Sequence, residues 1–125
     1  QELLDLAKAA SLKAYAPYSG YKVGSALRCE DGSVFLGANI ENASYSLTIC
    51  AERNAIFRAV LEGHQDIREI AIYVDVDQPF PPCGACRQVM AEFNPKMKVI
   101  FANRNETIIS DLGALLPGHF SLEKL

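Results

Sequence analysis

Three cysteines and one glutamate have the residue types and spacing of a catalytic metal site. Cys50 and Glu52 stand two residues apart in LTICAERNAIF, where an apolar run changes to a helical pattern. Cys83 and Cys86 stand three residues apart in PCGAC, so both fall on one face of a first helical turn and their sulfurs can reach one ion. Because Cys50 also opens a predicted helix, the sequence predicts that the three thiolates converge on a single metal.

Three protein ligands suit a catalytic zinc ion better than a structural one. Structural zinc usually takes four protein ligands, whereas catalytic zinc keeps one tetrahedral position for water. Cys29, the fourth cysteine, lies just before a predicted hairpin turn and is expected to be a small core or surface residue. We therefore expect one Zn²⁺ per chain, with an open position for water.

Glu52 and Arg53 follow Cys50 at the start of the same predicted helix. Zinc can bring the pKa of a bound water to about 7, and a neighbouring carboxylate can accept that proton and pass it on. The negative charge of three thiolates would weaken the effect of zinc on the pKa of the water. The partial positive charge of the helix N-termini would offset part of that negative charge. Arg53 lies three residues from Cys50 on the same face, so we expect it to neutralise the thiolates.

Each of these residues also has a simpler interpretation. The C-x-x-C pair alone is compatible with a thioredoxin-like redox site, which would explain neither Cys50 nor Glu52. Glu52 alone would be a first-turn carboxylate that suits the helix dipole, and Arg53 alone a solvated helix residue. Their occurrence together with three suitably spaced cysteines favours the catalytic interpretation.

The elements that must position these residues follow from hydrophobic periodicity and turn signals. A length of 125 residues suits one domain over 1–125, without repeats or linkers. Helices are predicted over 2–16, 50–62 and 82–93, strands over 22–30, 33–41, 67–76, 98–102 and 107–110, and a last helical turn over 111–116. Strands alternating with helices predict an α/β fold, a three-layer α-β-α sandwich with a central mixed five-stranded sheet.

The composition indicates a soluble globular protein of a reducing, cytoplasmic compartment. Half of the residues are hydrophobic, and no apolar run approaches the length of a membrane span. A net charge of −3 with 12 scattered basic residues favours a small or neutral substrate over nucleic acid. The C-x-x-C spacing favours metal chemistry over disulfides. The beginning, QELLDLAKAA, does not resemble a signal peptide, and the lack of an initial methionine leaves processing open.

The cysteine motifs resemble those of a known enzyme family. C-A-E at Cys50–Glu52 followed by P-C-G-A-C at Pro82–Cys86 is the cysteine-ligand form of the zinc deaminase signature. From YAPYSGYKVGSAL to the terminal LLPGHFSLEKL, the chain resembles the small, homotetrameric cytidine deaminases. This resemblance implies hydrolytic deamination of cytidine and 2′-deoxycytidine in pyrimidine salvage. It also implies zinc on Cys50, Cys83 and Cys86, with Glu52 moving protons between the water, ring atom N3 and the departing amine.

The same resemblance implies residues that bind the nucleoside. The backbone at Ala51 would hold the polar edge of the pyrimidine ring. Alternation along strand 33–41 puts Phe35, Asn39 and Glu41 on one face, which without the resemblance would be a solvent-facing polar edge. The resemblance implies Phe35 against the base, and Asn39 and Glu41 on the ribose hydroxyls. Buried groups tuned to hydroxyls discriminate against ligands that lack them, so nucleoside should be preferred over free cytosine.

Further copies of the chain are the implied protein partners. In the resembling proteins, neighbouring subunits close the pocket, with Tyr45 of one chain near the sugar and Phe120 of another near the base. Without the resemblance, Tyr45 would be a loop aromatic and Phe120 an anchor of the C-terminal tail. A homotetramer with shared active sites is therefore expected. Ser46 and Pro81 depart from the common pattern, which has glycine and serine there, and affect loop geometry rather than the chemistry.

Three alternatives share parts of this pattern. A deaminase of a related aminated compound, such as an aminonucleoside antibiotic, would keep the zinc site and change the pocket, but Asn39 and Glu41 favour ribose. A non-catalytic, zinc-stabilised nucleoside-binding or assembly protein would not need Glu52. RNA or DNA editing needs a basic channel, and we expect neither nucleic acid nor a membrane as a partner.

Overall fold

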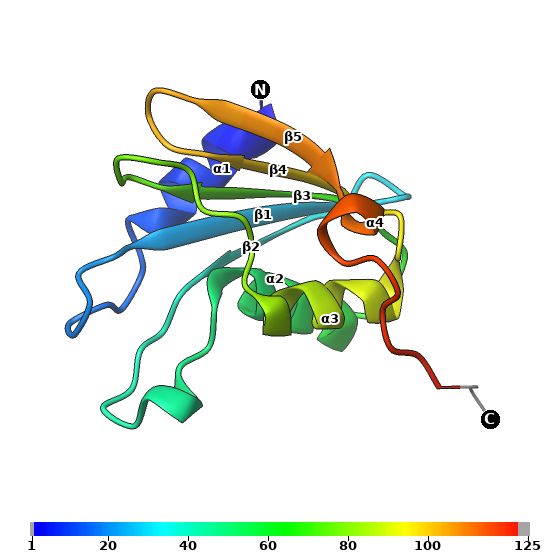
Figure 1. Ribbon diagram of the computed structural model, residues 1–125, viewed down its shortest axis with the longest axis horizontal. Coiled ribbons are helices and arrows are strands. Elements are labelled where there is room, and N and C mark those ends of the chain that lie inside the picture. Colours follow the sequence, from blue (N-terminus) through cyan, green and yellow to red (C-terminus); the bar gives the residue numbers. More distant parts are fainter. Residues whose placement is uncertain (1, 123–125) are drawn as a thin grey trace.

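A five-stranded sheet separates two layers of helices in the computed structural model, which describes residues 2–122 (Figure 1). The elements are α1 Glu2–Ser11, β1 Val23–Cys29, β2 Val34–Ala38, the 3₁₀ helix η1 Tyr45–Leu47, α2 Ala51–Leu61, β3 Ile67–Val74, α3 Gly84–Phe93, β4 Lys98–Ala102, β5 Thr107–Asp111 and α4 Leu112–Leu115. The predicted α-β-α sandwich is confirmed.

The sheet is mixed, with the strand order β2-β1-β3-β4-β5. Strands β3 and β4 are parallel, and the other neighbouring pairs are antiparallel. The β1–β2 hairpin turns at Gly32, whose φ of 91° lies in the left-handed region that favours glycine. Parallel β3 and β4 need a crossover connection, which contains α3, and α3 lies on the same side of the sheet as α2 (Figure 1).

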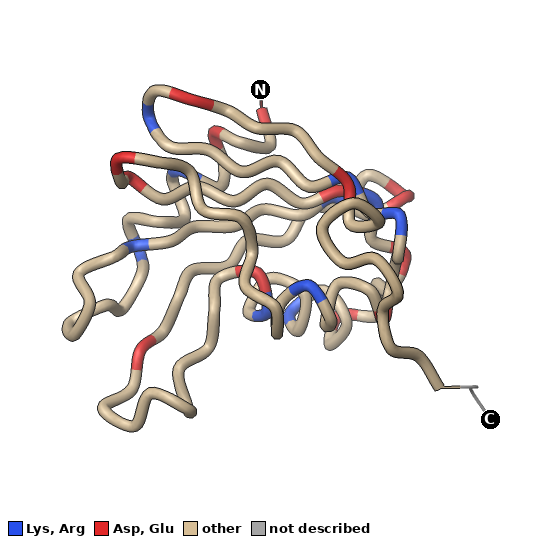
Figure 2. Tube along the Cα trace, in the orientation of Figure 1, with Lys and Arg blue, Asp and Glu red and all other residues tan. Residues whose placement is uncertain are grey.

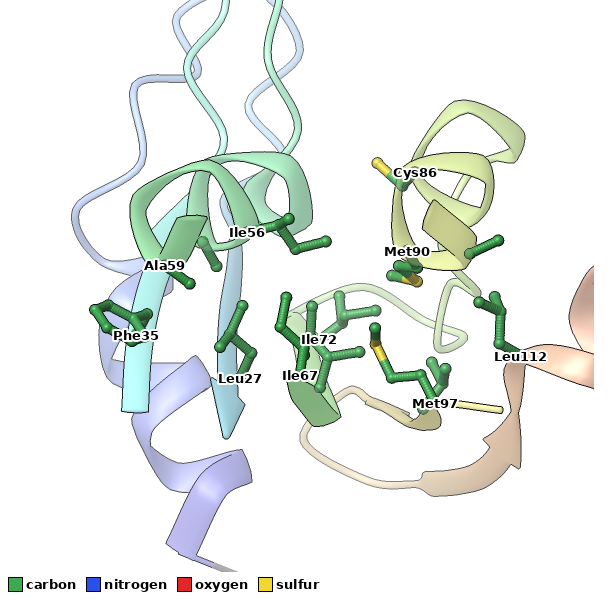
Figure 3. Close-up of a cluster of buried hydrophobic side chains, with 14 of the residues drawn as sticks. Leu27, Phe35, Ile56, Ala59, Ile67, Ile72, Cys86, Met90, Met97 and Leu112 are labelled. Atoms are coloured by element: carbon green, nitrogen blue, oxygen red, sulfur yellow. The ribbon is translucent and has the colours of Figure 1, made fainter. Parts of the chain in front are cut away.

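Each face of the sheet has its own apolar core. On one face, Leu3 and Ala7 of α1 pack against Ala26, Ala71 and Ile100 of the central strands. On the other face, α2 and α3 enclose the larger core, in which side chains of both helices meet those of β1, β3 and β4 (Figure 3). Alternation along each strand supplies both faces, because successive side chains point to opposite sides.

Two glycines let the helices approach the strands closely. A Cβ atom on Gly24 would lie 1.9 Å from the backbone oxygen of Ala7 in α1. A Cβ atom on Gly37 would lie 2.3 Å from the backbone oxygen of Ala51, at the start of α2. The first turn of α2 therefore rests directly on β2.

The first helix ends earlier than its periodicity predicts. Helix α1 stops at Ser11, and Leu12 is exposed. Tyr15 pairs instead with the chain beyond β2: its amide donates to Asn39 O at 2.9 Å, and its carbonyl accepts from Glu41 N at 2.8 Å. Pairing between distant segments has overridden local helix propensity over residues 12–16.

Charged residues are spread over the molecule. Lysine and arginine occur on helices, strands and connections without forming a stripe among the described residues (Figure 2). Some are paired, as Arg104 is with Asp75 at 3.3 Å and Arg28 with Glu69 at 3.5 Å. None of the helices described for this chain combines the length and apolar character that a membrane crossing needs.

Candidate metal centre and active site

The three cysteines lie at the starts of two helices. Cys50 is the N-cap of α2, and Cys83 is the N-cap of α3; both have an extended backbone, with ψ of 156° and 167°. Cys86 follows in the first turn of α3, where its amide donates to Cys83 Sγ at 3.4 Å. Helices α2 and α3 cover the same face of the sheet (Figure 1), and their N-termini lie close together, with the Cys50 and Cys83 sulfurs 3.8 Å apart.

The sulfur atoms of Cys50, Cys83 and Cys86 all lie within 4.8 Å of one another. The Cys50 and Cys83 sulfurs are 3.8 Å apart. Cys86 is buried, Cys50 is half-buried and Cys83 is exposed, so the trio opens to one side. No other Cys, His, Asp or Glu within residues 2–122 contributes a ligand atom to this cluster. Cys29 is buried at the end of β1 and takes no part.

Glu52 is a buried carboxyl beside the trio. It is the second residue of α2, it is 5% exposed, and it lines the same pocket as Cys50 and Cys83. Burial raises the pKa of Glu52 to about 7, and the negative charge of Cys50 adds to this effect. A carboxyl group whose pKa lies near neutral pH can both accept and release a proton.

Arg53 and Cys86 stabilise a thiolate at Cys50. Arg53 Nη2 donates to Cys50 Sγ at 3.2 Å. Hydrogen bonding to Cys86, followed by that from Arg53, lowers the pKa of Cys50 to about 5 despite its burial. The same bond to Cys50, followed by burial, raises the pKa of Cys86. The expected contact between Arg53 and a cysteine sulfur is thus present in the structure.

The pocket beside Cys50, Glu52 and Cys83, here called the cysteine pocket, has a volume of about 160 Å³. It is lined by Val23, Asn39, Thr48, Cys50, Ala51, Glu52, Ile72, Val74, Phe80, Pro81 and Cys83. Five of the residues expected from the sequence to form the site therefore meet in one cavity: Asn39, Cys50, Ala51, Glu52 and Cys83.

Asn39 lies in the pocket wall and ties two segments together. It is buried, its Nδ2 donates to Tyr21 O at 2.8 Å, and its Oδ1 accepts from Val23 N at 2.9 Å. One hydrogen on Nδ2 and one lone pair on Oδ1 remain for a ligand. Glu41 lies outside the pocket lining. Its carboxylate accepts hydrogen bonds from the 18–19 segment, among which the Ser19 hydroxyl has the largest effect in lowering the pKa of Glu41.

The structure does not bring Phe35 to the pocket. Phe35 has the expected facing, toward α2, but it is buried in the core with its ring 5.1 Å from that of His64 (Figure 3). Phe35 and Asn39 are four positions apart, which corresponds to about 13 Å of extended chain. Alternation predicts the face on which a side chain lies, but it does not indicate which position along that face adjoins a site.

Tyr45 and Phe120 also lie outside the pocket of the single chain. Tyr45 is on η1, 74% exposed, with its ring 6.4 Å from that of Tyr18. Phe120 is 65% exposed, and its backbone oxygen accepts from Gln88 Nε2 at 2.8 Å. Both are large apolar side chains exposed to solvent in the single chain.

Comparisons with known proteins agree with this geometry. Residues 1–103 match the family model of the cytidine and deoxycytidylate deaminase zinc-binding region. The chain is 51% identical over 114 residues to a cytidine deaminase of Halalkalibacterium halodurans, covering 90% of this chain and 86% of that protein. It is 46% identical over 127 residues to a cytidine deaminase of Sporosarcina psychrophila, covering 100% and 93%.

A solved structure gives the same result. The crystal structure of a cytidine deaminase from Burkholderia pseudomallei matches with a TM-score of 0.92 and 47% identity, covering 95% of this chain and 97% of that one. The chain belongs to the cytidine deaminase family.

The metal ligands of this cytidine deaminase family member fit zinc. Three sulfurs bound at about 2.3 Å to one tetrahedral ion lie about 3.8 Å apart, and the Cys50 and Cys83 sulfurs have that separation, 3.8 Å. The family model is that of a zinc-binding region, and the three cysteines are the group that can hold the ion. Zinc is the cofactor.

Some pocket residues of this family member were not anticipated from the sequence. They are Val23, Thr48, Ile72, Val74 and Phe80. Most of them are apolar wall residues whose place in the pocket follows only from the tertiary fold. Phe80 could have been found from the sequence, because it stands three residues before the metal ligand Cys83 in the run PFPPC.

Proposed function

We propose that this chain catalyses the zinc-dependent hydrolytic deamination of cytidine and 2′-deoxycytidine, giving uridine or 2′-deoxyuridine and ammonia. The observation that carries the proposal is the convergence of three cysteine sulfurs beside a buried glutamate in one small pocket. Cytidine deaminase is also the name of the relatives to which the chain is similar over most of its length.

The chain's own residues have distinct roles in this reaction. Cys50, Cys83 and Cys86 hold zinc, which when bound supplies a Lewis acid that acidifies water. Glu52 accepts one proton from the attacking water and delivers it to ring atom N3. It then takes the second proton of the same oxygen, now bonded to C4, and delivers it to the departing amine. Its pKa of about 7 supports a group that gains and loses a proton in each cycle. Arg53 stabilises the thiolate of Cys50 through its hydrogen bond.

The walls of the pocket orient the nucleoside. We assign the backbone of Ala51 to the polar edge of the pyrimidine, and the spare donor and acceptor of Asn39 to a ribose hydroxyl. Glu41 binds the sugar from outside the pocket of the single chain, beyond Asn39. Asn39 has the further task of fixing the backbone at Tyr21 and Val23, which supports a preformed site.

The complete site is assembled from several copies of the chain. Tyr45 and Phe120 are exposed by 74% and 65%, and a neighbouring subunit would cover them while they reach its pocket. We propose a homotetramer with shared sites, acting in the cytoplasm in pyrimidine salvage. Light scattering of the purified protein measures the subunit number directly.

Turnover of cytidine tests the proposed function. Purified, zinc-replete protein is mixed with cytidine, and the ultraviolet absorbance and released ammonia are followed together. We expect one ammonia per uridine formed, similar use of 2′-deoxycytidine and much slower use of free cytosine. An aminonucleoside antibiotic serves as the alternative substrate. The absence of cytidine turnover in a zinc-replete sample would reject the proposal.

A further inference from the structure

Phe80 is a partly exposed aromatic residue directly before the metal ligands. It is 45% exposed, lines the cysteine pocket and stands three residues before Cys83. Pro79 and Pro81 flank it. Proline fixes its own φ and excludes the helical region for the residue before it, so the backbone at Phe80 has few alternatives. The ring is held on a stiff segment.

Side-chain hydrogen bonds anchor both ends of this segment. Asn103 Nδ2 donates to the carbonyl oxygens of Val76 and Asp77, at 2.8 and 3.1 Å. Arg87 Nε donates to the carbonyl oxygen of Pro82 at 2.7 Å. These bonds fix the connection between β3 and α3, and the position of Phe80 is set with them.

The ring of Phe80 also packs against a second aromatic residue. Its centroid lies 6.2 Å from that of Tyr21, with the ring planes at 90°, an edge-to-face arrangement that is favourable for aromatic pairs. The backbone of Tyr21 is in turn fixed by Asn39 Nδ2. The pair joins the β3–α3 connection to the segment before β1.

Phe80 lines two cavities. One is the cysteine pocket of about 160 Å³. The other is a groove of about 580 Å³, here called the outer groove, which is lined by Tyr21, Asp75, Val76, Asp77, Gln78 and Phe80. Among the residues that the structure describes, Phe80 is the one that lines both. Ligand sites for small molecules usually have roughly 300–1,000 Å³, so the cysteine pocket alone is small, and its boundary decides what can enter.

We propose that Phe80 sets the upper size limit for the pyrimidine that this enzyme accepts, by closing the cysteine pocket against the outer groove. The inference rests on the proposed function and deepens it, because it names the residue that excludes larger pyrimidine nucleosides. Truncation of the ring joins the two cavities, so a substituent on the pyrimidine gains space that it lacks beside Phe80.

Selectivity between small and large pyrimidine nucleosides tests this role. The kcat/KM of the wild-type chain and of Phe80→Ala is measured for cytidine, 5-methylcytidine, 5-bromocytidine and N4-methylcytidine. The selectivity ratio is the kcat/KM for an analogue divided by the kcat/KM for cytidine. For at least one bulkier analogue, we expect Phe80→Ala to raise this ratio by about tenfold or more, which is the size of the effect of one extra group in an apolar pocket. A smaller rise for every analogue would overturn the proposal.

Two further variants separate the size limit from other effects of the substitution. Phe80→Tyr retains the ring and should keep the wild-type ratio. Phe57→Ala removes a phenylalanine of similar exposure, 48%, from α2 outside the cysteine pocket, and should leave the ratio unchanged. An equal rise of the ratio in Phe57→Ala would overturn the assignment to Phe80.

Binding of products tests the same limit without turnover. Calorimetry with uridine and 5-bromouridine should show the larger ligand gaining affinity relative to uridine in Phe80→Ala by about tenfold. A wild-type chain that binds uridine but does not deaminate cytidine would refute the proposed function alone. An unchanged ratio of affinities would refute the size limit alone.

Discussion

The two faces of the sheet are packed by similar means but differ in what they bury. Helix α1 approaches the sheet over Gly24, and helix α2 approaches it over Gly37. The α1 face buries aliphatic and aromatic side chains, whereas the α2 face also buries the carboxyl of Glu52 next to three cysteines. Burying a carboxyl group is costly, and its raised pKa reflects that cost.

This comparison shows that helix packing alone does not make a site. The α2 face differs because two helices, α2 and α3, begin close together on it. Their N-caps, Cys50 and Cys83, therefore face each other. The α1 face has one helix and no such meeting point. We therefore assign the proposed chemistry to the helix starts of the α2 face, and we expect the α1 face to contribute mainly to stability.

The largest expected effect comes from Glu52→Gln, which removes the proposed proton carrier and keeps the shape of the side chain. We expect kcat/KM for cytidine to fall by about 10³-fold, within the range of general acid–base catalysis, while bound zinc is retained. Steady-state kinetics and elemental analysis of the same sample measure both quantities.

Glu62→Gln is the matched control at the other end of α2. Glu62 is exposed and pairs with Arg58 at 3.2 Å, a contact worth about 0.5 kcal/mol or less. Its activity should stay within about twofold of wild type. Near-normal activity of Glu52→Gln would contradict the role of Glu52.

The two glycines allow the difference between the faces to be measured. In Gly37→Ala, the new Cβ would lie 2.3 Å from Ala51 O and 2.5 Å from Ala55 N, so α2 must move with Glu52. A displacement of about 1 Å at a reacting group can cost about a hundredfold in rate, and we expect a loss of that size per folded molecule.

Gly24→Ala displaces α1 instead, because its Cβ would lie 1.9 Å from Ala7 O. We expect a loss of unfolding free energy of about 1–3 kcal/mol, as for other overpacked positions, with activity per folded molecule within a few-fold of wild type. Denaturant unfolding measures the stability of Gly37→Ala and Gly24→Ala, and steady-state kinetics measures their activity per folded molecule. Equal losses of specific activity would show that the faces do not differ in function.

A smaller effect is expected from Arg53→Ala. Loss of the hydrogen bond from Arg53 Nη2 to Cys50 Sγ should weaken zinc binding by about tenfold, the lower range for partners of metal ligands. Competition with a chromophoric chelator measures the zinc affinity. Arg58→Ala on the exposed part of α2 is the control. Equal zinc affinities in the two variants would contradict a role of Arg53 at the metal centre.

The cysteine trio could be predicted from sequence because its geometry is local. Cys83 and Cys86 share one helical turn, and Cys50 joins them once α2 and α3 cover the same face. The same reasoning gave the sandwich and the approximate bounds of most elements. It extended α1 too far because the pairing of Tyr15 with the chain beyond β2 is a contact between distant segments.

Residues of the substrate side were harder to predict, for physical reasons. Alternation gave Phe35 and Asn39 the same face but not their distances from the cysteines, and only Asn39 lies in the pocket. Phe80 was missed although it is close to Cys83 in sequence, because its partner Tyr21 lies far away along the chain. The roles proposed for Tyr45 and Phe120 require neighbouring subunits, and a single sequence does not show how subunits would be arranged.

Zinc-edge anomalous scattering from crystals of the purified protein tests the central claim most directly. The account predicts one zinc per chain, about 2.3 Å from the sulfurs of Cys50, Cys83 and Cys86, with a non-protein oxygen in the fourth position next to Glu52. A chain without zinc, or a fourth protein side chain bound to the ion, would contradict the account.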